Sequence, residues 1–502
     1  MIPDIDFEDF SRRYTLGEPQ VLFRSLVADL DTPVSAFMKV TKGEKYCCLL
    51  ESVEGGDSRG RYSIIGLKPD VIWRNDGSTT EICRSVHEDV EPVYEKMAGE
   101  PLDCLRQLID ESLIELPHPL PPMAAGLVGY MAYDMVRQME DIGPARPDPL
   151  NLATSIFIRP TVMAIFDGVT NLVTIVTPVR SSGEQDARAA FDDAQLLIDQ
   201  MLDRLDAPLP LSDSVSAPLI QEPVSNTPKQ QYLDMVQEAQ DYILKGDIFQ
   251  VVLSQRFTMP FELPAFSLYR ALRRTNPSPF MYHLAFDDFS IVGSSPEILV
   301  RLRDDEITIR PIAGTRPRGE DVSADKALTD ELLSDEKELA EHLMLLDLGR
   351  NDVGRVAKAG TVEVTARNTV EYYSHVMHIV SNVVGEIDPK FDAIDALSAG
   401  FPAGTVSGAP KIRAMEVIDE LEIEARGPYA GSVGYFSANG SMDTAIVLRT
   451  AIVKDGEMHV QAGAGVVADS DPNAEYEECV NKARALVVAA KEALRFASSN
   501  RG

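Results

Sequence analysis

The chain has few cysteines and fewer basic than acidic residues, and both features exclude classes of protein. Its 502 residues contain 5 cysteines, an odd number, and no two of them are spaced as Cys-x-x-Cys. This pattern disfavours a disulfide framework and a thiolate metal site, and it favours a reduced, cytoplasmic compartment. With 47 basic against 79 acidic residues the net charge is -32, and no basic run resembles a nucleic-acid-binding surface. We therefore expect no nucleic acid partner.

Long apolar runs are also missing. Arg159 and Asp167 interrupt the longest candidate, so no stretch reaches the roughly 18 residues that a membrane span requires. The amino-terminal sequence MIPDIDFEDFSRRY contains neither a basic region nor an apolar stretch, and it does not predict a secretory signal. We therefore expect no membrane partner.

Two common catalytic motifs are absent as well. No cysteine lies in Gly-x-Cys-x-Gly, so the sequence does not support a covalent hydrolase with a cysteine nucleophile. The spacing G-x-x-x-x-G-K-[ST] of a phosphate-binding P-loop does not occur either. The chemistry must therefore come from other residues.

The length of the chain predicts two domains or one large composite body, because single cores stop growing at roughly 250 to 300 residues. Residues 207–228 are rich in proline and serine and show no periodicity, which predicts a linker. We place the boundary there, between an amino-terminal region, 1–225, and a carboxyl-terminal region, 226–498. Local signals do not say which strands pair, so sheets that cross the linker stay possible.

The secondary-structure signals favour an α+β fold. Three β-rich runs are each interrupted by a dipeptide that tolerates the positive φ angles of hairpin turns: Asp167-Gly168, Asn439-Gly440 and Asp455-Gly456. Residues 184–205 and 228–245 predict helices, and a strand follows the second of them. Because helices and strands do not alternate regularly, we expect antiparallel sheets with helices on their outer faces.

Two pairs of glutamates have the same spacing in separate predicted helices. Glu338 and Glu341 form one pair, and Glu475 and Glu478 form the other. A spacing of three places both carboxylates of a pair on one helical face. If the two faces converge, the four oxygen-donating side chains predict a magnesium site. The alternative is that each pair lies on a solvated helix face, where such spacing is common.

Other segments predict a site for a small anion. Arg449 lies in AIVLRTAIV, which otherwise predicts a buried strand, so its charge needs either an anionic ligand or an internal salt bridge. Gly463 and Gly465 expose backbone N–H groups in the strand expected to pair with it. The loop around Thr405 leads into a helix near Pro410, and helix starts favour anions. A small carboxylate is the ligand that these features favour.

His378 lies in a predicted strand and shares a face with Val376, Val380 and Val384. A histidine in this setting is more often a core residue that makes hydrogen bonds than a catalyst. It is nevertheless a candidate general acid or base, because its unperturbed pKa lies near neutrality.

Six segments together resemble the chorismate-utilising enzymes, and among their branches the motifs are most similar to anthranilate synthase component I. The segments are PIAGTRPRG (311–319), ELAEHLMLLDLGRND (338–352), FPAGTVSGAPK (401–411), GYFSANGSMDTAIVLR (434–449), QAGAGVVADSDP (461–472) and EYEECVNKAR (475–484). The resemblance is dense over residues 230–495 and thinner before them. It implies a sandwich of large antiparallel sheets, a regulatory region at 1–225 and a chorismate-binding catalytic region at 226–498.

The resemblance implies that the chain converts chorismate and ammonia to anthranilate and pyruvate in tryptophan biosynthesis. A separate glutamine amidotransferase subunit, component II, would supply the ammonia, so a hetero-oligomer is implied. The alternative is aminodeoxychorismate synthase component I of folate biosynthesis. Its members often carry a lysine where this chain has Ala313, and relatives that add water carry a lysine at the place of Gln250.

The resemblance also implies roles for individual residues. Magnesium would be bound mainly by Glu341 and Glu478, with Glu338 and Glu475 acting through water. His378, Glu297 and Glu338 are the candidates for proton transfer. The implied substrate-binding residues are Gly314, Thr315, Thr405, Tyr429, Arg449, Gly463, Ala464, Gly465 and Lys482.

A second implied site binds L-tryptophan as a feedback inhibitor. Without the resemblance, the segment LLES (49–52), which belongs to this site, would be interpreted only as the end of a strand. Phe280 stands where the family usually has tyrosine, and Ala445 stands where some relatives have cysteine. These two differences affect the expected affinity for tryptophan. The implied residues are Glu51, Ser52, Pro279, Phe280, Met281, Tyr282, Gly293 and Tyr435.

Overall fold

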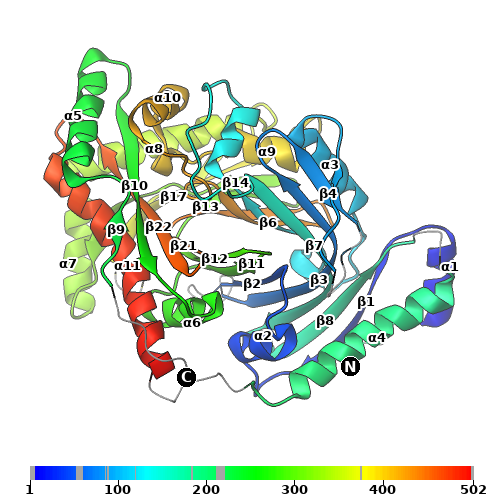
Figure 1. The fold of residues 1–502 in the computed structure, drawn as a ribbon. Helices are drawn as coiled ribbons and strands as arrows, with labels where there is room; N and C mark the ends of the chain where they lie inside the picture. The colour runs from blue at the N-terminus through cyan, green and yellow to red at the C-terminus, as the bar shows by residue number, and fades with distance from the viewer. Residues whose placement is uncertain are drawn as a thin grey trace.

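The computed structural model describes residues 6–52, 60–84, 86, 90–118, 120–181, 185–210, 221–373 and 376–498. Within them, every pairing between strands is antiparallel. Figure 1 shows the strands in the centre of the molecule and most helices around them. The predicted α+β fold is therefore confirmed.

The bounds of the elements are as follows. The strands are β1 (Gln20–Val27), β2 (Cys47–Glu51), β3 (Tyr62–Asn75), β4 (Thr80–Cys83), β5 (Glu95–Lys96), β6 (Gly126–Met131), β7 (Ser155–Asp167), β8 (Leu172–Val179), β9 (Val224–Ser225), β10 (Gln250–Pro260), β11 (Phe280–Ala285), β12 (Phe289–Ser295), β13 (Ile298–Arg303), β14 (Glu306–Ile309), β15 (Ile312–Pro317), β16 (Glu363–Tyr372), β17 (Val376–Glu386), β18 (Gly408–Ala409), β19 (Ser432–Ser437), β20 (Met442–Ile446), β21 (Thr450–Lys454) and β22 (Glu457–Val466). The helices are α1 (Phe7–Thr15), α2 (Pro33–Thr41), α3 (Pro101–Glu111), α4 (Ala187–Asp206), α5 (Lys229–Lys245), α6 (Ala265–Thr275), α7 (Val322–Leu332), α8 (Glu336–Gly354), α9 (Ala393–Gly400), α10 (Lys411–Leu421) and α11 (Pro472–Ser498), with short 3-10 helices η1 (Pro122–Ala124), η2 (Tyr133–Gln138) and η3 (Gly404–Val406).

The strands form two sheets that are joined along one side. In the first sheet the order is β10–β22–β21–β12–β11–β2–β3. In the second sheet it is β7–β6–β19–β20–β13–β14–β17. The long strands β3 and β7 pair with each other and so connect the two sheets.

The hydrophobic clusters show that the two sheets pack face to face. One cluster joins Tyr282 and Ile452 of the first sheet to Val433 and Tyr435 of the second. Alternate residues point to the opposite faces, as the period of a strand requires. On these outer faces the first sheet packs against α2, α4, α6 and α11, and the second packs against α3, α8 and α9. The arrangement is therefore the expected sandwich with helices outside.

Strands from before and after the predicted linker lie in the same sheets. β2 pairs with β11 in the first sheet, and β6 pairs with β19 in the second. The central part of the predicted linker, residues 211–220, lies outside the described residues. The boundary between 1–225 and 226–498 stays a prediction.

The predicted local elements agree with the structure in most places. The three expected hairpins form as β7–β8, β19–β20 and β21–β22. In the first of them the positive φ angle falls at Asn171 and not at the predicted dipeptide. The predicted helices at 184–205 and 228–245 correspond to α4 and α5.

One strand prediction is wrong. The run AIVLRTAIV is not continuous, because β20 ends at Ile446, β21 begins at Thr450, and Arg449 lies between them with a φ of 46°. The physical reason is that β20 belongs to the second sheet and β21 to the first. The chain has to turn where it passes from one sheet to the other. Arg449 therefore lies at a crossing between the sheets and not inside a strand.

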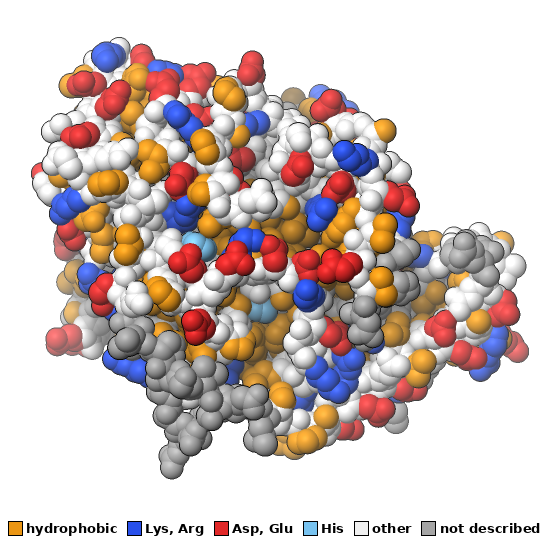
Figure 2. Space-filling view, in the orientation of Figure 1, with side chains coloured by type: hydrophobic (Ala, Val, Ile, Leu, Met, Phe, Trp, Pro, Cys, Tyr) orange, Lys and Arg blue, Asp and Glu red, His pale blue; other side chains and the backbone are white. Residues whose placement is uncertain are grey.

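The cysteines and the charged side chains agree with the composition. All five cysteines are free and buried. Among the described residues, no helix has both the length and the apolar character that a membrane crossing requires. On the face shown in Figure 2, basic side chains lie dispersed among acidic ones.

Candidate active site

The two glutamate pairs lie on helices, as predicted. Glu338 and Glu341 are on the first two turns of α8, and Glu475 and Glu478 are on the first two turns of α11. The side chain of Asp335 accepts hydrogen bonds from the backbone N–H groups of Lys337 and Glu338, which fixes the start of α8.

The carboxylates of these helices act on one another electrostatically. Burial raises the pKa of Glu341; a hydrogen bond from Gln250 opposes this shift, and the charges of Glu338 and Glu478 add to it. Burial likewise raises the pKa of Glu475, and the charge of Glu478 adds to that shift. The site thus concentrates negative charge in a partly buried region. Such a field favours a bound cation.

Two cationic side chains already contact these acids. Lys482 Nζ lies 2.7 Å from Glu478 Oε1, and Arg316 Nη1 lies 3.0 Å from Glu338 Oε1. Within the described part of the chain, no three His, Cys, Asp or Glu side chains converge closely enough to hold a metal ion. The carboxylates would therefore have to reorient to bind one.

The donor set nevertheless fits magnesium. Four carboxylates supply hard oxygen ligands. Gln250 Nε2 donates to Glu341 Oε1 at 3.3 Å, while its buried Oε1 has no hydrogen-bond partner within the described residues. Carbonyl oxygens of this kind accept hydrogen bonds from the waters that magnesium retains.

His378 is held by a neighbouring strand. Its Nδ1 lies 3.0 Å from the carbonyl oxygen of Gly314 and 3.0 Å from Thr315 Oγ1. A carbonyl oxygen only accepts, so Nδ1 carries the proton and Nε2 keeps a lone pair. Burial lowers the pKa of His378, and the nearby charge of Arg449 lowers it further. The imidazole is therefore neutral near pH 7 and suited to act as a base.

Glu297 lies at a second crossing between the sheets, between β12 and β13. It is 7% exposed, and burial raises its pKa to about 8. Thr405 Oγ1 donates to its two carboxylate oxygens at 3.1 and 3.2 Å. At neutral pH this side chain is a protonated carboxylic acid, which can donate a proton to a leaving group.

The glycines of β22 allow close contacts. A Cβ at Gly463 would lie 2.7 Å from Tyr429 Oη, and a Cβ at Gly465 would lie 2.8 Å from Gln250 Nε2. Lys482 Nζ donates to the carbonyl oxygen of Gly463 at 3.0 Å. The structure therefore brings Tyr429 and Lys482 to the glycine strand. Ala464, which lies between the two glycines, is fully buried.

Most of the predicted tryptophan-binding residues lie in or next to strands β2, β11 and β12 of the first sheet, but on two faces of it, and Tyr435 lies in β19 of the second sheet. Glu51 pairs with Met281, and Gly293 pairs with Tyr282. Tyr282 and Tyr435 face the interior of the sandwich, in the same hydrophobic cluster. Pro279 and Phe280 precede Met281 at the start of β11, and the Ser52 N–H lies 3.4 Å from the carbonyl oxygen of Tyr62.

Glu51 points to the opposite face, where α6 packs. Its buried carboxylate accepts hydrogen bonds from Tyr269 Oη and from Arg273, whose Nε lies 2.9 Å from Oε1. These two partners could not be predicted from the sequence, because both lie more than 200 positions from Glu51. The Glu51 side chain is therefore occupied by α6 and does not reach the face of Tyr282.

Known proteins are similar to this chain over nearly its whole length. The chorismate binding enzyme family matches residues 47–488. Anthranilate synthase component 1 of Cereibacter sphaeroides is 55% identical over 492 residues, covering 98% of this chain and 98% of that one.

Solved structures resemble the fold over nearly its whole length. Anthranilate synthase component I of Streptococcus pneumoniae has a TM-score of 0.76 at 35% identity, covering 92% of this chain and 99% of that one. The menaquinone-specific isochorismate synthase of Escherichia coli has a TM-score of 0.71 at 19% identity, covering 96% and 98%, and this likeness concerns the fold alone. From the family match and from these identities, the chain belongs to the chorismate binding enzyme family.

Proposed function

We propose that this chain is the synthase component of an anthranilate synthase, which converts chorismate and ammonia to anthranilate and pyruvate. The observation that supports it most directly is the 55% identity to an anthranilate synthase component 1 over 98% of both chains. The protonated Glu297 and the neutral His378 provide the acid and the base that the reaction needs.

The first half of the reaction adds ammonia at C2 of chorismate while the C4 hydroxyl leaves as water. Glu297 is suited to protonate that hydroxyl, because its carboxyl carries a proton near neutral pH. Ala313 and Gln250 leave no lysine at either family position that would attack the ring or activate water. Ammonia is therefore the nucleophile that this site favours.

The second half eliminates pyruvate and restores the aromatic ring. His378 Nε2 would take the proton from C2, and the electrons of that C–H bond would enter the ring as the C3–O bond breaks. Arg449, Thr405 and Tyr429, together with the backbone N–H groups of β22, would bind the carboxylates of the substrate.

Magnesium is the cofactor that the glutamates would bind. Glu341 and Glu478 would hold it directly, with Glu338 and Glu475 acting through water. When bound, the ion would supply positive charge to neutralise the ring carboxylate of the substrate. A separate glutamine amidotransferase component would supply ammonia, and L-tryptophan would inhibit from the site around Tyr282 and Gly293.

The test is direct. The purified chain should produce fluorescent anthranilate from chorismate, magnesium and ammonium salt. Formation of aminodeoxychorismate in its place would favour the folate-pathway alternative, which the names of the relatives do not favour. No consumption of chorismate under these conditions would overturn the proposal.

A further inference from the structure

A buried ion pair lies beside the candidate active site, and the chemistry described above does not use it. Arg426 is in the loop between α10 and β19, and Glu422 directly follows the last residue of α10. Their side chains are 1% and 4% exposed. Arg426 Nε lies 3.0 Å from Glu422 Oε2, and Nη2 lies 2.6 Å from Oε1, so the pair is bidentate.

The remaining donors of Arg426 reach two backbone carbonyl oxygens on other elements. Nη1 donates to Val406 at 2.7 Å, and Nη2 donates to Val252 at 2.6 Å. Val406 follows Thr405, the hydrogen-bond donor to Glu297. Val252 lies in β10 directly opposite Gly465 of β22. One guanidinium therefore connects the loop of Thr405 to the strand that faces the glycines.

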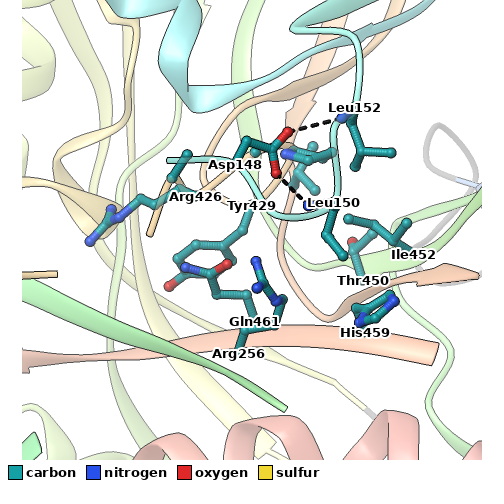
Figure 3. A pocket seen from close by; sticks show the side chains of 14 residues that line it. Asp148, Leu150, Leu152, Arg256, Arg426, Tyr429, Thr450, Ile452, His459 and Gln461 are labelled. Atoms are coloured by element: carbon teal, nitrogen blue, oxygen red, sulfur yellow. Dashed lines mark hydrogen bonds between the residues drawn. The ribbon is translucent and has the colours of Figure 1, made fainter. Parts of the chain in front are cut away.

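Arg426 also contacts a predicted substrate-binding side chain. Its Cζ lies 5.6 Å from the centre of the Tyr429 ring and 4.8 Å from that of Tyr133. The hydroxyl of Tyr429 reaches Gly463, as described above. Arg426, Tyr429 and Gln461 line the same cavity, and Figure 3 labels them there.

Glu422 is itself held in place by β10 and, through it, by β22. Its Oε1 accepts hydrogen bonds from the backbone N–H of Ser254 at 2.8 Å and from Ser254 Oγ at 2.9 Å. Gln461 Nε2 in turn donates to Ser254 Oγ at 2.8 Å. The carboxylate of Glu422 is thus held by Ser254 of β10 as well as by Arg426.

A buried ion pair of this kind adds little to stability compared with apolar side chains of similar volume. The contribution of the ion pair is geometric instead, because the planar guanidinium holds each of its hydrogen-bond acceptors at a defined angle. The backbone acceptors of Arg426 lie next to Thr405 and opposite Gly465, and its guanidinium lies beside the ring of Tyr429.

We propose that Arg426, held by Glu422, is a positioning residue for the chorismate site, which sets the Thr405 loop, the Tyr429 ring and the β10–β22 strands relative to one another. This inference rests on the proposed function, because the reaction provides the assay. Arg426 needs no contact with the substrate to act in this way.

The test compares Arg426→Lys with a matched control elsewhere. Arg159 is also buried and also bidentate, with both donors 2.8 Å from Asp70, but its partners lie in β3 and near α3. Arg426→Lys should lower kcat/KM for chorismate by about 100-fold, since a small displacement of reacting groups has that effect. Arg159→Lys should leave kcat/KM within about threefold at a similar Tm.

A second readout separates positioning from a general loss of stability. The hydrogen bond from Thr405 lowers the pKa of Glu297. If Arg426 holds Thr405, both Arg426→Lys and Thr405→Val should move the pH profile of kcat to higher pH. The loss in the double variant should be smaller than the product of the single losses by at least about threefold, because the two residues act together.

If Arg426→Lys folds poorly, a second variant still tests the proposal. Arg426→Met combined with Glu422→Gln replaces both charges while Gln still accepts from Ser254, so it should fold and still lose activity. Equal activity of that variant and the unmodified chain would overturn the positioning role, as would additive losses in the double-variant comparison. If the unmodified chain produced no anthranilate, the proposed function would fail instead.

Discussion

The backbone N–H of Ser294 donates a hydrogen bond to the carbonyl oxygen of Arg449 at 3.1 Å. Ile446 N–H donates in the same way to the carbonyl oxygen of Glu297 at 3.0 Å. These bonds join the two places where the chain passes between the sheets. The candidate acid and the candidate anion-binding side chain are therefore placed by backbone contacts, which persist when either side chain is replaced.

The first prediction concerns the metal. Glu341→Gln and Glu478→Gln should each lower turnover by at least about 100-fold, because each removes a charged oxygen ligand. Glu477→Gln is the matched control on α11, since Glu477 points to solvent and contacts Lys229. Magnesium titration by calorimetry gives a readout that does not depend on turnover, and binding should weaken only in the first two variants.

Stability in the absence of magnesium provides a second check. Since burial and neighbouring charge raise the pKa of Glu341, its ionised form is unfavourable in the folded chain. Glu341→Gln should therefore keep or raise the Tm measured in EDTA. A clear fall in Tm would mean that this carboxylate is structural, and full activity of the unmodified chain in EDTA would contradict the metal role.

The second prediction concerns Glu297 and pH. Its folded pKa of about 8 lies above that of an unfolded glutamate, so the stability it contributes is fully present below the unfolded pKa. This stability is lost as the pH rises through about 8. Glu297→Gln should remove that decline in Tm, and it should lower turnover by about 100-fold or more.

The pH dependence of kcat/KM should also depend on Glu297. After correction for the concentration of unprotonated ammonia, kcat/KM of the unmodified chain should fall as the pH rises above about 8. Glu297→Gln should show no such fall. A profile that stays flat to about pH 10 in the unmodified chain would exclude Glu297 as the proton donor.

The third prediction separates the two halves of the reaction. His378→Ala should slow pyruvate elimination more than amination, because only the elimination removes a proton from the ring carbon. Chromatography of the reaction mixture should then show an accumulated aminated intermediate. Uniform slowing without that intermediate would assign His378 a structural role through its hydrogen bond to Gly314.

The fourth prediction concerns feedback inhibition. Ser52→Phe should relieve inhibition by tryptophan and leave turnover without tryptophan nearly unchanged, since it fills space at the end of β2. Inhibition from a separate site corresponds to a coupling of about 1 to 3 kcal/mol. Tryptophan titrations at matched chorismate concentration measure it, and an unchanged response would show that the site lies elsewhere.

The structure adds a second variant to that test. Tyr282 Oη lies 2.5 Å from Thr450 Oγ1, and Thr450 directly follows Arg449. This contact leads from the candidate tryptophan site to the candidate anion site. Tyr282→Phe should therefore weaken the effect of tryptophan on the KM for chorismate more than it weakens tryptophan binding.

The fifth prediction concerns the source of ammonia. The isolated chain should use ammonium salt but not glutamine, because no cysteine in the sequence lies in the Gly-x-Cys-x-Gly motif of a cysteine nucleophile. Addition of the glutaminase component should restore glutamine-dependent activity. Strong glutamine-dependent turnover by the isolated chain would contradict this prediction.

Regular spacing allowed the glutamate pairs to be predicted from the sequence, and Asp-Gly and Asn-Gly dipeptides allowed the three hairpins to be predicted. A spacing of three fixes the relative direction of two side chains within one helix, whatever that helix packs against. The position of Arg449 could not be predicted in this way. Its run has the composition of a strand, and only the pairing of β20 and β21 with different sheets interrupts it.

The hydrogen bonds of Arg426 could not be predicted from the sequence for a similar reason. Its hydrogen-bond partners Val252, Val406 and Glu422 come from separate elements, and two of them accept through backbone oxygens that have no side-chain signature. The same holds for Glu51, whose partners in α6 become neighbours only after the first sheet has formed.

The pairing of β6 with β19 has a consequence for how the chain reaches its native state. Met131 in β6 pairs with Ser432 in β19. A strand that is synthesised early therefore stays unpaired until the carboxyl-terminal part of the chain has been synthesised. Contacts so distant in sequence slow folding and leave strand edges exposed in the meantime. A fragment that begins after residue 225 would lack β2 and β6, so β11 and β19 would become open edges, which promote aggregation.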